Sequence, residues 1–85
     1  MNPPRKADDL DVRTVGDEVL VHHPAAQKVH ILNRTAGQIL ELCDGARTPD
    51  DIVTVICKDT GADPAVVAKD VAQILVDFQK LGLVS

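Results

Sequence analysis

Three helix-start signals divide the chain into two unlike halves. Asn33 stands directly before an apolar pattern with helical spacing, and Thr48-Pro49 and Asp63-Pro64 each pair a capping residue with a proline. Such side chains accept hydrogen bonds from the free amides of a first helical turn, where proline is also tolerated. We therefore expect three helices after residue 33. The first should end at Asp44-Gly45 and the third at about Leu81, before Gly82.

The residues before Asn33 show the shorter repeat of strands. Segments 10–15 (LDVRTV), 18–23 (EVLVHH) and 28–32 (KVHIL) alternate or run apolar, with Gly16-Asp17 and Pro24 between them. Connections this short predict antiparallel pairing. The expected fold class is α+β: a small winged helix-turn-helix domain, with a three-stranded antiparallel sheet followed by three helices. Residues 1–9 are polar and are expected to form a flexible N-terminal tail, so the domain would span 10–85.

Composition excludes several classes of function. Nine Lys and Arg face thirteen Asp and Glu, and Phe78 is the only aromatic residue. Nucleic-acid binding needs cations for phosphates and aromatic rings for bases, so no nucleic-acid partner is expected. No apolar run approaches the ~20 residues of a membrane span, and the N-terminus lacks the apolar region of a secretory signal. We expect a cytoplasmic protein with no membrane partner.

The histidines and cysteines do not predict chemistry. His22 and His23 point to opposite faces of a strand, and His30 could lie near His22 across the hairpin, which supplies too few ligands for structural zinc. Cys43 and Cys57 are expected to be buried free thiols, since a disulfide is disfavoured in the cytoplasm. A pairing of Cys43 with a histidine is conceivable, but a thiol in an apolar stripe is normally inert. We expect no catalytic residue, no metal and no cofactor, hence no enzyme.

The third helix has more apolar surface than a core stripe needs. One sector of roughly 80° holds Val67, Val71, Ile74, Phe78 and Leu81, while Ala68, Ala72, Leu75 and Val76 extend the arc. The wider arc indicates either a broad core face under the sheet or a shallow groove for a partner chain. An edge strand could accept another strand, and "KVHIL" has only one Lys and no Pro to prevent it. The sequence leaves open which strand is the edge.

The ordered set of motifs resembles the PqqD-like family, also called RiPP recognition elements. Leu32, Asn33, Thr35 and Ala36 match its "LN-x-[TS]-A" pattern, and Ile39, Leu40 and Cys43 to Gly45 match "IL-x-x-CDG". Ile52-Val53, Asp70-Val71 and Gly82-Leu83 match the family's later pairs. The resemblance covers about Leu20 to Val84. The "PEG" element of members devoted to pyrroloquinoline quinone (PQQ) synthesis is absent, so that pathway is left open.

The resemblance implies a peptide chaperone without catalytic activity. It would capture the leader of a ribosomally made precursor peptide and present it to a modifying enzyme, often a radical SAM maturase. The leader would add as a strand beside the third strand and pack against the third helix. The expected peptide-binding residues are Lys28, Val29, His30, Ile31, Ala68, Ala72, Leu75, Val76 and Gln79. A monomer or weak homodimer is expected. The alternatives are a winged-helix DNA-binding protein and a regulatory or scaffold subunit.

Overall fold

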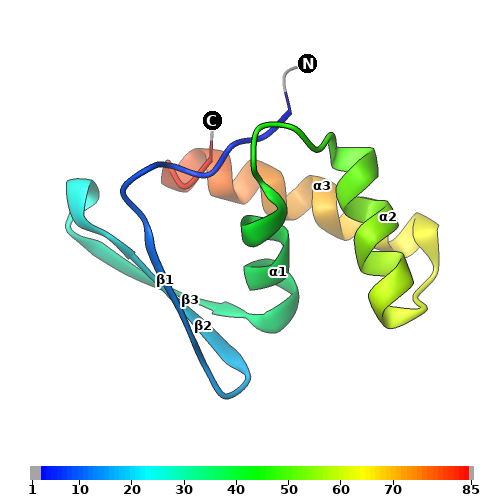
Figure 1. Ribbon diagram of the computed structural model, residues 1–85, viewed down its shortest axis with the longest axis horizontal. Helices are drawn as coiled ribbons and strands as arrows, with labels where there is room; N and C mark the ends of the chain where they lie inside the picture. Colours follow the sequence, from blue (N-terminus) through cyan, green and yellow to red (C-terminus); the bar gives the residue numbers. More distant parts are fainter. Residues whose placement is uncertain (1–2, 85) are drawn as a thin grey trace.

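The computed structural model describes residues 3–84 and confirms the predicted α+β fold. The strands are β1 (Asp11–Val15), β2 (Glu18–His23) and β3 (Lys28–Asn33), and a 3-10 turn, η1 (Pro24–Ala26), joins the last two. The helices are α1 (Arg34–Leu42), α2 (Pro49–Thr60) and α3 (Pro64–Leu81). They lie on one side of the sheet (Figure 1), in an arrangement consistent with a winged helix-turn-helix domain.

The sheet order β1-β2-β3 makes β2 the central strand and leaves β1 and β3 as edges. Both pairings are antiparallel, and Val19 and Val21 of β2 lie opposite Leu32 and His30 of β3. Val19 and Val21 are buried beneath the helices. The alternate positions form the other side of the sheet, which we call the open face: Asp11, Arg13, Val15, Glu18, Leu20, His22, Val29, Ile31 and Asn33.

Each predicted helix start is confirmed by a side-chain cap. The Asn33 side chain accepts a hydrogen bond from the Ala36 amide at 2.8 Å. Thr48 and Asp51 form a reciprocal capping box at the start of α2, and the Asp63 side chain accepts from the Ala65 amide. The end of α1 differs from the prediction, because its C-terminal cap is Cys43 and Gly45 takes its left-handed φ of 81° in the following loop.

The core of α3 is rotated relative to the prediction. Leu75, which we expected to line a groove, is 8% exposed and belongs to the core with Val71 and Phe78. Leu81, which we placed in the core, is exposed at the last turn of the helix. The chain turns at Gly82, and the fully buried Leu83 then packs into the core. Helical spacing alone could not reveal this later residue.

The N-terminal segment is attached to the domain, which differs from the expected flexible tail. The Lys6 amide donates to the Cys43 carbonyl at 2.8 Å, and the Gly45 amide donates to the Pro4 carbonyl at 2.9 Å. The Ala7 amide donates to the Leu83 carbonyl at 2.9 Å. These bonds satisfy backbone groups of two loops, which explains why a polar segment is held there. Residues 1, 2 and 85 of the predicted tail and domain lie outside the described residues.

Candidate functional site

The β3 edge is the first part of the candidate site. Within residues 3–84, β3 pairs with β2 alone. The edge of β3 that faces away from β2 therefore offers backbone donors and acceptors to a further strand. The predicted residues of this strand divide between the two sides of the sheet. Lys28 and His30 are on the helix-facing side, whereas Val29 and Ile31 are on the open face and are 62% and 65% exposed.

A stripe of exposed residues on α3 is the second part. Ala68, Ala72, Val76 and Gln79 are exposed at spacings of four, four and three residues, so they share one flank of the helix. Val76 is 44% exposed. Leu75 lies beside this flank but is buried, so it can serve only as a floor. We call the exposed four the α3 stripe. Its two alanines leave room for a close approach by another chain.

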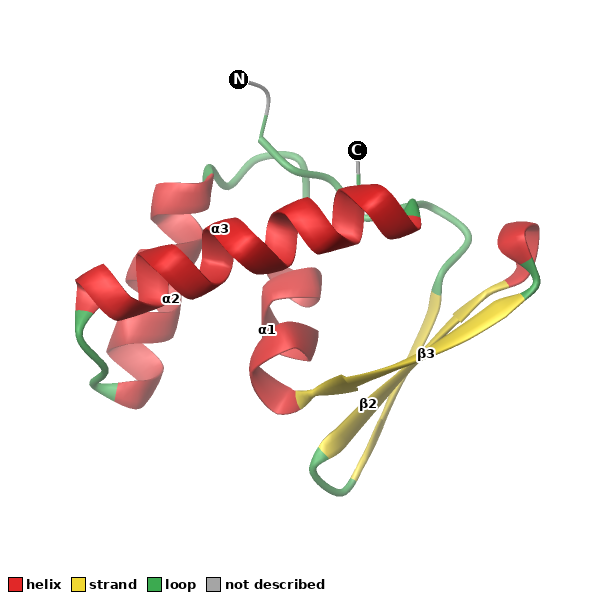
Figure 2. Cartoon of the chain, turned by 180° about the vertical axis from the view of Figure 1, so that it is seen from behind, coloured by secondary structure: helices red, strands yellow, loops and turns green. Residues whose placement is uncertain are grey.

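The end of α3 lies near the start of β3. A side chain at Gly82 would approach the ring of His23 at 3.7 Å, and His23 is the partner of Lys28 in the sheet. At its other end β3 runs directly into α1, which packs against both β3 and α3. In Figure 2, the view from behind, α3 and β3 both lie on the near side of the molecule. The edge and the α3 stripe thus belong to the same region.

The register of the sheet corrects our expectation for the histidines. His22 pairs with Val29 and lies on the open face, while His30 pairs with Val21 on the helix-facing side. His22 and His30 are therefore on opposite sides, and the expected neighbourhood was wrong. The register depends on the hairpin connection, which here includes η1. Among residues 3–84 no group of three His, Cys, Asp or Glu side chains is placed to hold a metal.

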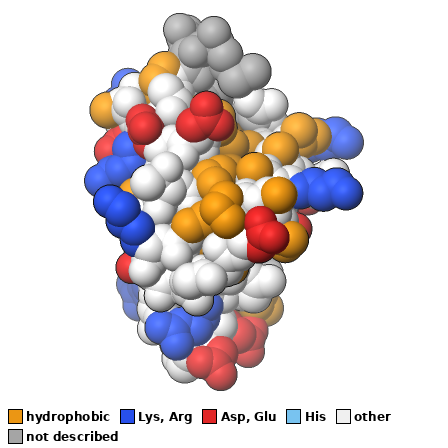
Figure 3. Space-filling view, turned by 90° about the vertical axis from the view of Figure 1, so that its right-hand side faces the viewer, with side chains coloured by type: hydrophobic (Ala, Val, Ile, Leu, Met, Phe, Trp, Pro, Cys, Tyr) orange, Lys and Arg blue, Asp and Glu red, His pale blue; other side chains and the backbone are white. Residues whose placement is uncertain are grey.

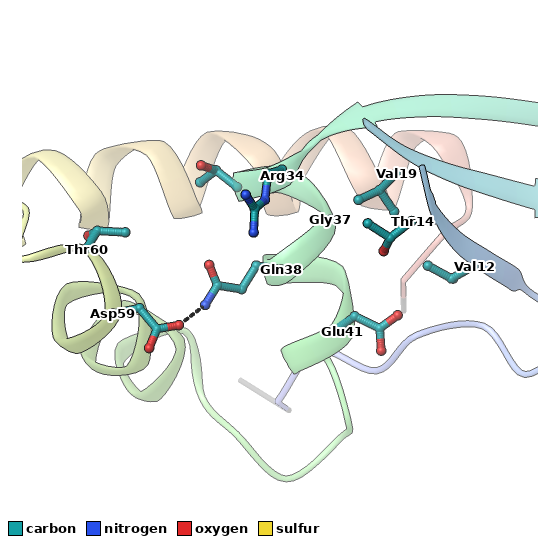
Figure 4. Close-up of a pocket in the computed structure, with 10 residues that line it drawn as sticks. Val12, Thr14, Val19, Arg34, Gly37, Gln38, Glu41, Asp59 and Thr60 are labelled. Atoms are coloured by element: carbon teal, nitrogen blue, oxygen red, sulfur yellow. Dashed lines mark hydrogen bonds between the residues drawn. The ribbon is translucent and has the colours of Figure 1, made fainter. Parts of the chain in front are cut away.

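A groove of about 510 Å³, lined by both polar and apolar residues, lies on the other side of α1, away from the α3 stripe. Residues of β1, β2, α1 and the end of α2 line it (Figure 4), and the amide of Gln38 donates to Asp59 at 2.5 Å across it. Its charged side chains are partly paired, since Arg34 lies 4.0 Å from Asp17 and Glu41 lies 3.6 Å from Lys6. No predicted site residue lines this groove. Its lining comes from four separate elements, from β1 to the end of α2, and no local motif signals it.

A hydrophobic patch gathers over the face that carries α2 and the start of α3 (Figure 3), with charged side chains around it. Val66, in the first turn of α3, is exposed. The elements on this face are helices, which have no free strand edge. This patch therefore lacks the backbone component that the β3 region has.

The surroundings of the Cys43 thiol make it a poor nucleophile. It is buried and donates a hydrogen bond to the Ile39 carbonyl at 3.2 Å. Burial, together with the neighbouring Asp44 carboxylate, raises the pKa of Cys43 to about 11 from its ordinary value of 9.0. The thiolate, which is the nucleophilic form, is therefore scarce at neutral pH. This arrangement gives no support to a pairing of Cys43 with a histidine base.

The raised pKa predicts a stability that falls in alkali. The unfolded thiol loses its proton near pH 9 and the folded one near pH 11, so the folded state binds more protons between these values. Stability from this group is complete below pH 9 and declines as pH rises towards 11. Urea denaturation at pH 8 and at pH 10.5 should show this decline. The same comparison on Cys43→Ala should show a smaller decline, and equal declines would contradict the assignment.

A small domain in which a free edge strand, β3, lies in the same region as an exposed helix stripe is suited to accepting an added strand. The chain belongs to the family described as coenzyme PQQ synthesis protein D (PqqD), whose model matches residues 18–84. The resemblance carried by the motifs is thus confirmed. No curated protein matches the chain.

Solved structures with the same fold include two in complex with peptides. TbiB1 in complex with the TbiA(beta) leader peptide is 22% identical, with a TM-score of 0.82 over 95% of this chain and 94% of that one. Lasso peptide synthetase B1 complexed with the leader peptide is 14% identical, with a TM-score of 0.80 over 98% of both chains. The PqqD truncation of Methylobacterium extorquens PqqCD, described as a stand-alone RiPP recognition element, is 21% identical. Its TM-score is 0.80 over 96% of this chain and 87% of that one.

Proposed function

We propose that this protein captures the leader of a ribosomally made precursor peptide and presents it to a modifying enzyme. The observation that carries the proposal is the free β3 edge, which lies in the same region as the α3 stripe. Strand addition to a sheet edge is a recurrent way to bind peptides. Support also comes from two proteins of the same fold, whose structures contain leader peptides.

The bound leader would form a fourth strand of the sheet. Hydrogen bonds between the backbone of residues 28–31 and that of the leader would supply affinity that depends little on the sequence of the leader. Side chains on the helix-facing side of the leader would pack on Ala68, Ala72, Val76 and Gln79, above the buried Leu75. The small side chains allow the leader to lie close to α3. Such a division gives the peptide both a fixed register and a preferred composition.

The protein would catalyse no covalent change in the peptide and would need no cofactor or metal. Its partners would be the precursor peptide and a radical SAM or other peptide-modifying enzyme in the cytoplasm, with the domain at residues 10–85 acting as a monomer or weak homodimer. No helix within residues 3–84 is both long and apolar enough to cross a bilayer. The pathway could be PQQ synthesis or that of another modified peptide.

A DNA-binding winged helix is not favoured. The loop before α2 offers Arg47, but its guanidinium is already paired with Asp44 at 2.6 Å. Asp50 and Asp51 occupy the first turn of α2, so two acidic side chains would face the DNA if α2 served as the recognition helix. The net charge of −4 adds a general repulsion.

The proposal is tested by titrating the isotope-labelled protein with the leader of the precursor peptide encoded beside it. We expect the amide signals of residues 28–31 and 68–79 to shift, while those of α2 stay in place. A peptide of the same composition in scrambled order is the control. Absence of shifts with the true leader would contradict the proposal.

A further inference from the structure

Both edge strands carry exposed apolar residues on the open face, but only β3 carries two of them at successive positions of that face. On β1 this face carries Asp11 and Arg13, which form an ion pair at 3.3 Å, and Val15 next to the turn to β2. On β3 the open face carries Val29 and Ile31, which are the two most exposed large hydrophobic residues of the part of the chain that the structure describes. The open face of β1 is therefore mainly charged, with one valine, whereas that of β3 is mainly apolar. Natural proteins usually place charges or prolines at a free edge to prevent association, and the open face of β3 does the reverse.

The half-buried Leu20 extends this apolar surface into the central strand. It lies directly opposite Ile31 in the register, with Val29 two residues further along the same face. Leu20, Val29 and Ile31 therefore form an apolar cluster at the free edge of β3. Single exposed apolar residues are ordinary in soluble proteins, but an apolar cluster at an unpaired strand edge can be extended by the side chains of an added strand.

We infer that the strand bound at β3 carries apolar side chains on the open face as well as towards α3. This inference rests on the proposed function and specifies the chemistry of its ligand. A strand added beside β3 places alternate side chains on the open face, with Cβ atoms about 4.5–5.5 Å from those directly opposite. β-branched and aromatic residues pair best with Val29 and Ile31 at this distance. The helix-facing residues of the same strand meet the alanines and Val76 of the α3 stripe.

The recognised segment is therefore a continuous apolar run of about five residues. A segment that alternates apolar and polar residues would bury only one of its faces and leave Val29 and Ile31 against polar neighbours. Both faces of the bound strand contribute to recognition, although only one of them is covered by a helix. This distinguishes the ligand from an ordinary amphipathic edge strand, which reads as a strict alternation.

Threonine substitutions test the inference, because threonine keeps the β-branched shape and strand preference of valine while a hydroxyl replaces one methyl group. The variants are Val29→Thr, Ile31→Thr and the double variant. Calorimetry measures the affinity of each for the leader of the precursor peptide encoded beside this protein. We expect each single change to weaken binding by about 1.5- to 5-fold and the double change by about 10-fold. Val15→Thr is the matched control, because Val15 is also on the open face and 60% exposed but lies on β1. It should leave the affinity within about 1.5-fold.

Three outcomes would overturn the inference, and they differ in what they say of the proposed function. Wild-type affinity in the double variant, with binding still sensitive to changes on α3, would remove the inference and keep the proposed function. Unchanged leader affinity with slower peptide modification would indicate that the apolar cluster contacts the modifying enzyme and not the leader. No binding of the leader by the wild-type protein would remove both the inference and the proposed function.

Discussion

Replacing Ala72 with arginine should abolish leader binding while leaving the domain folded. Ala72 is exposed at the middle of the α3 stripe, where a close-lying strand would leave no room for a long charged side chain. Overpacking of this kind costs about 2 kcal/mol or more, so the dissociation constant should rise at least about 30-fold. Arginine is a good helix former, and thermal unfolding should therefore change little. Calorimetric titration with the leader measures the first effect and thermal unfolding the second.

Gln73→Arg is the control for this substitution. Gln73 is the next residue on the same helix and is exposed, but it lies away from the α3 stripe, where its amide bonds to Asp77 at 3.1 Å. The same added charge there should leave leader affinity within about 2-fold, since surface charges far from a contact are largely screened. Equal losses in the two variants would indicate a nonspecific charge effect, and no loss in Ala72→Arg would contradict the proposed site.

Gly37→Ala should destabilise the fold, although alanine is the better helix former. Gly37 is buried in α1 and lies against Val19 of β2, so an added Cβ would stand 2.8 Å from the Cβ of Val19 and closer still to one of its methyl groups. The clash should cost more than the ~1 kcal/mol that alanine gains in a helix. We expect a net loss of about 2 kcal/mol, which lowers Tm by about 8–16 °C in a domain of this size.

The double variant Gly37→Ala, Val19→Ala tests the cause of this loss. Removing the methyl groups of Val19 makes room for the new Cβ, so the double variant should be more stable than the sum of the single changes predicts. A coupling free energy of about 1 kcal/mol or more is expected for residues in direct contact. Additive effects would show that the clash is relieved by another movement.

Features fixed by neighbouring residues were the ones that could be predicted from the sequence. The caps at Asn33, Thr48 and Asp63 act within three residues, so the helix starts were visible without a structure. Positions set by distant segments were less accessible. The buried place of Leu75 depends on how α3 rotates against the other elements, and that of Pro4 goes with a hydrogen bond from the amide of Gly45, a residue far away in sequence.

The candidate site was predictable in part for the same reason. The apolar excess along α3 is a local pattern, so Ala68, Ala72 and Val76 could be named from the sequence. The choice of β3 as a free edge came from family resemblance, because strand order is a property of the whole sheet. The sides on which Val29, His30 and His22 lie follow from the register, which the 3-10 turn between β2 and β3 helps to set.

The pairing of Lys6 with Val84 has a practical consequence for engineering. Two residues near opposite ends of the described chain are backbone partners, and this pair lies at the end of α3 (Figure 1). A domain whose ends meet can be inserted into a surface loop of another protein, or permuted to new ends, with little distortion of either partner. Such a graft would keep the strand order, in which β3 is an edge strand. The fold could therefore serve as a portable peptide-docking module on an enzyme that has none.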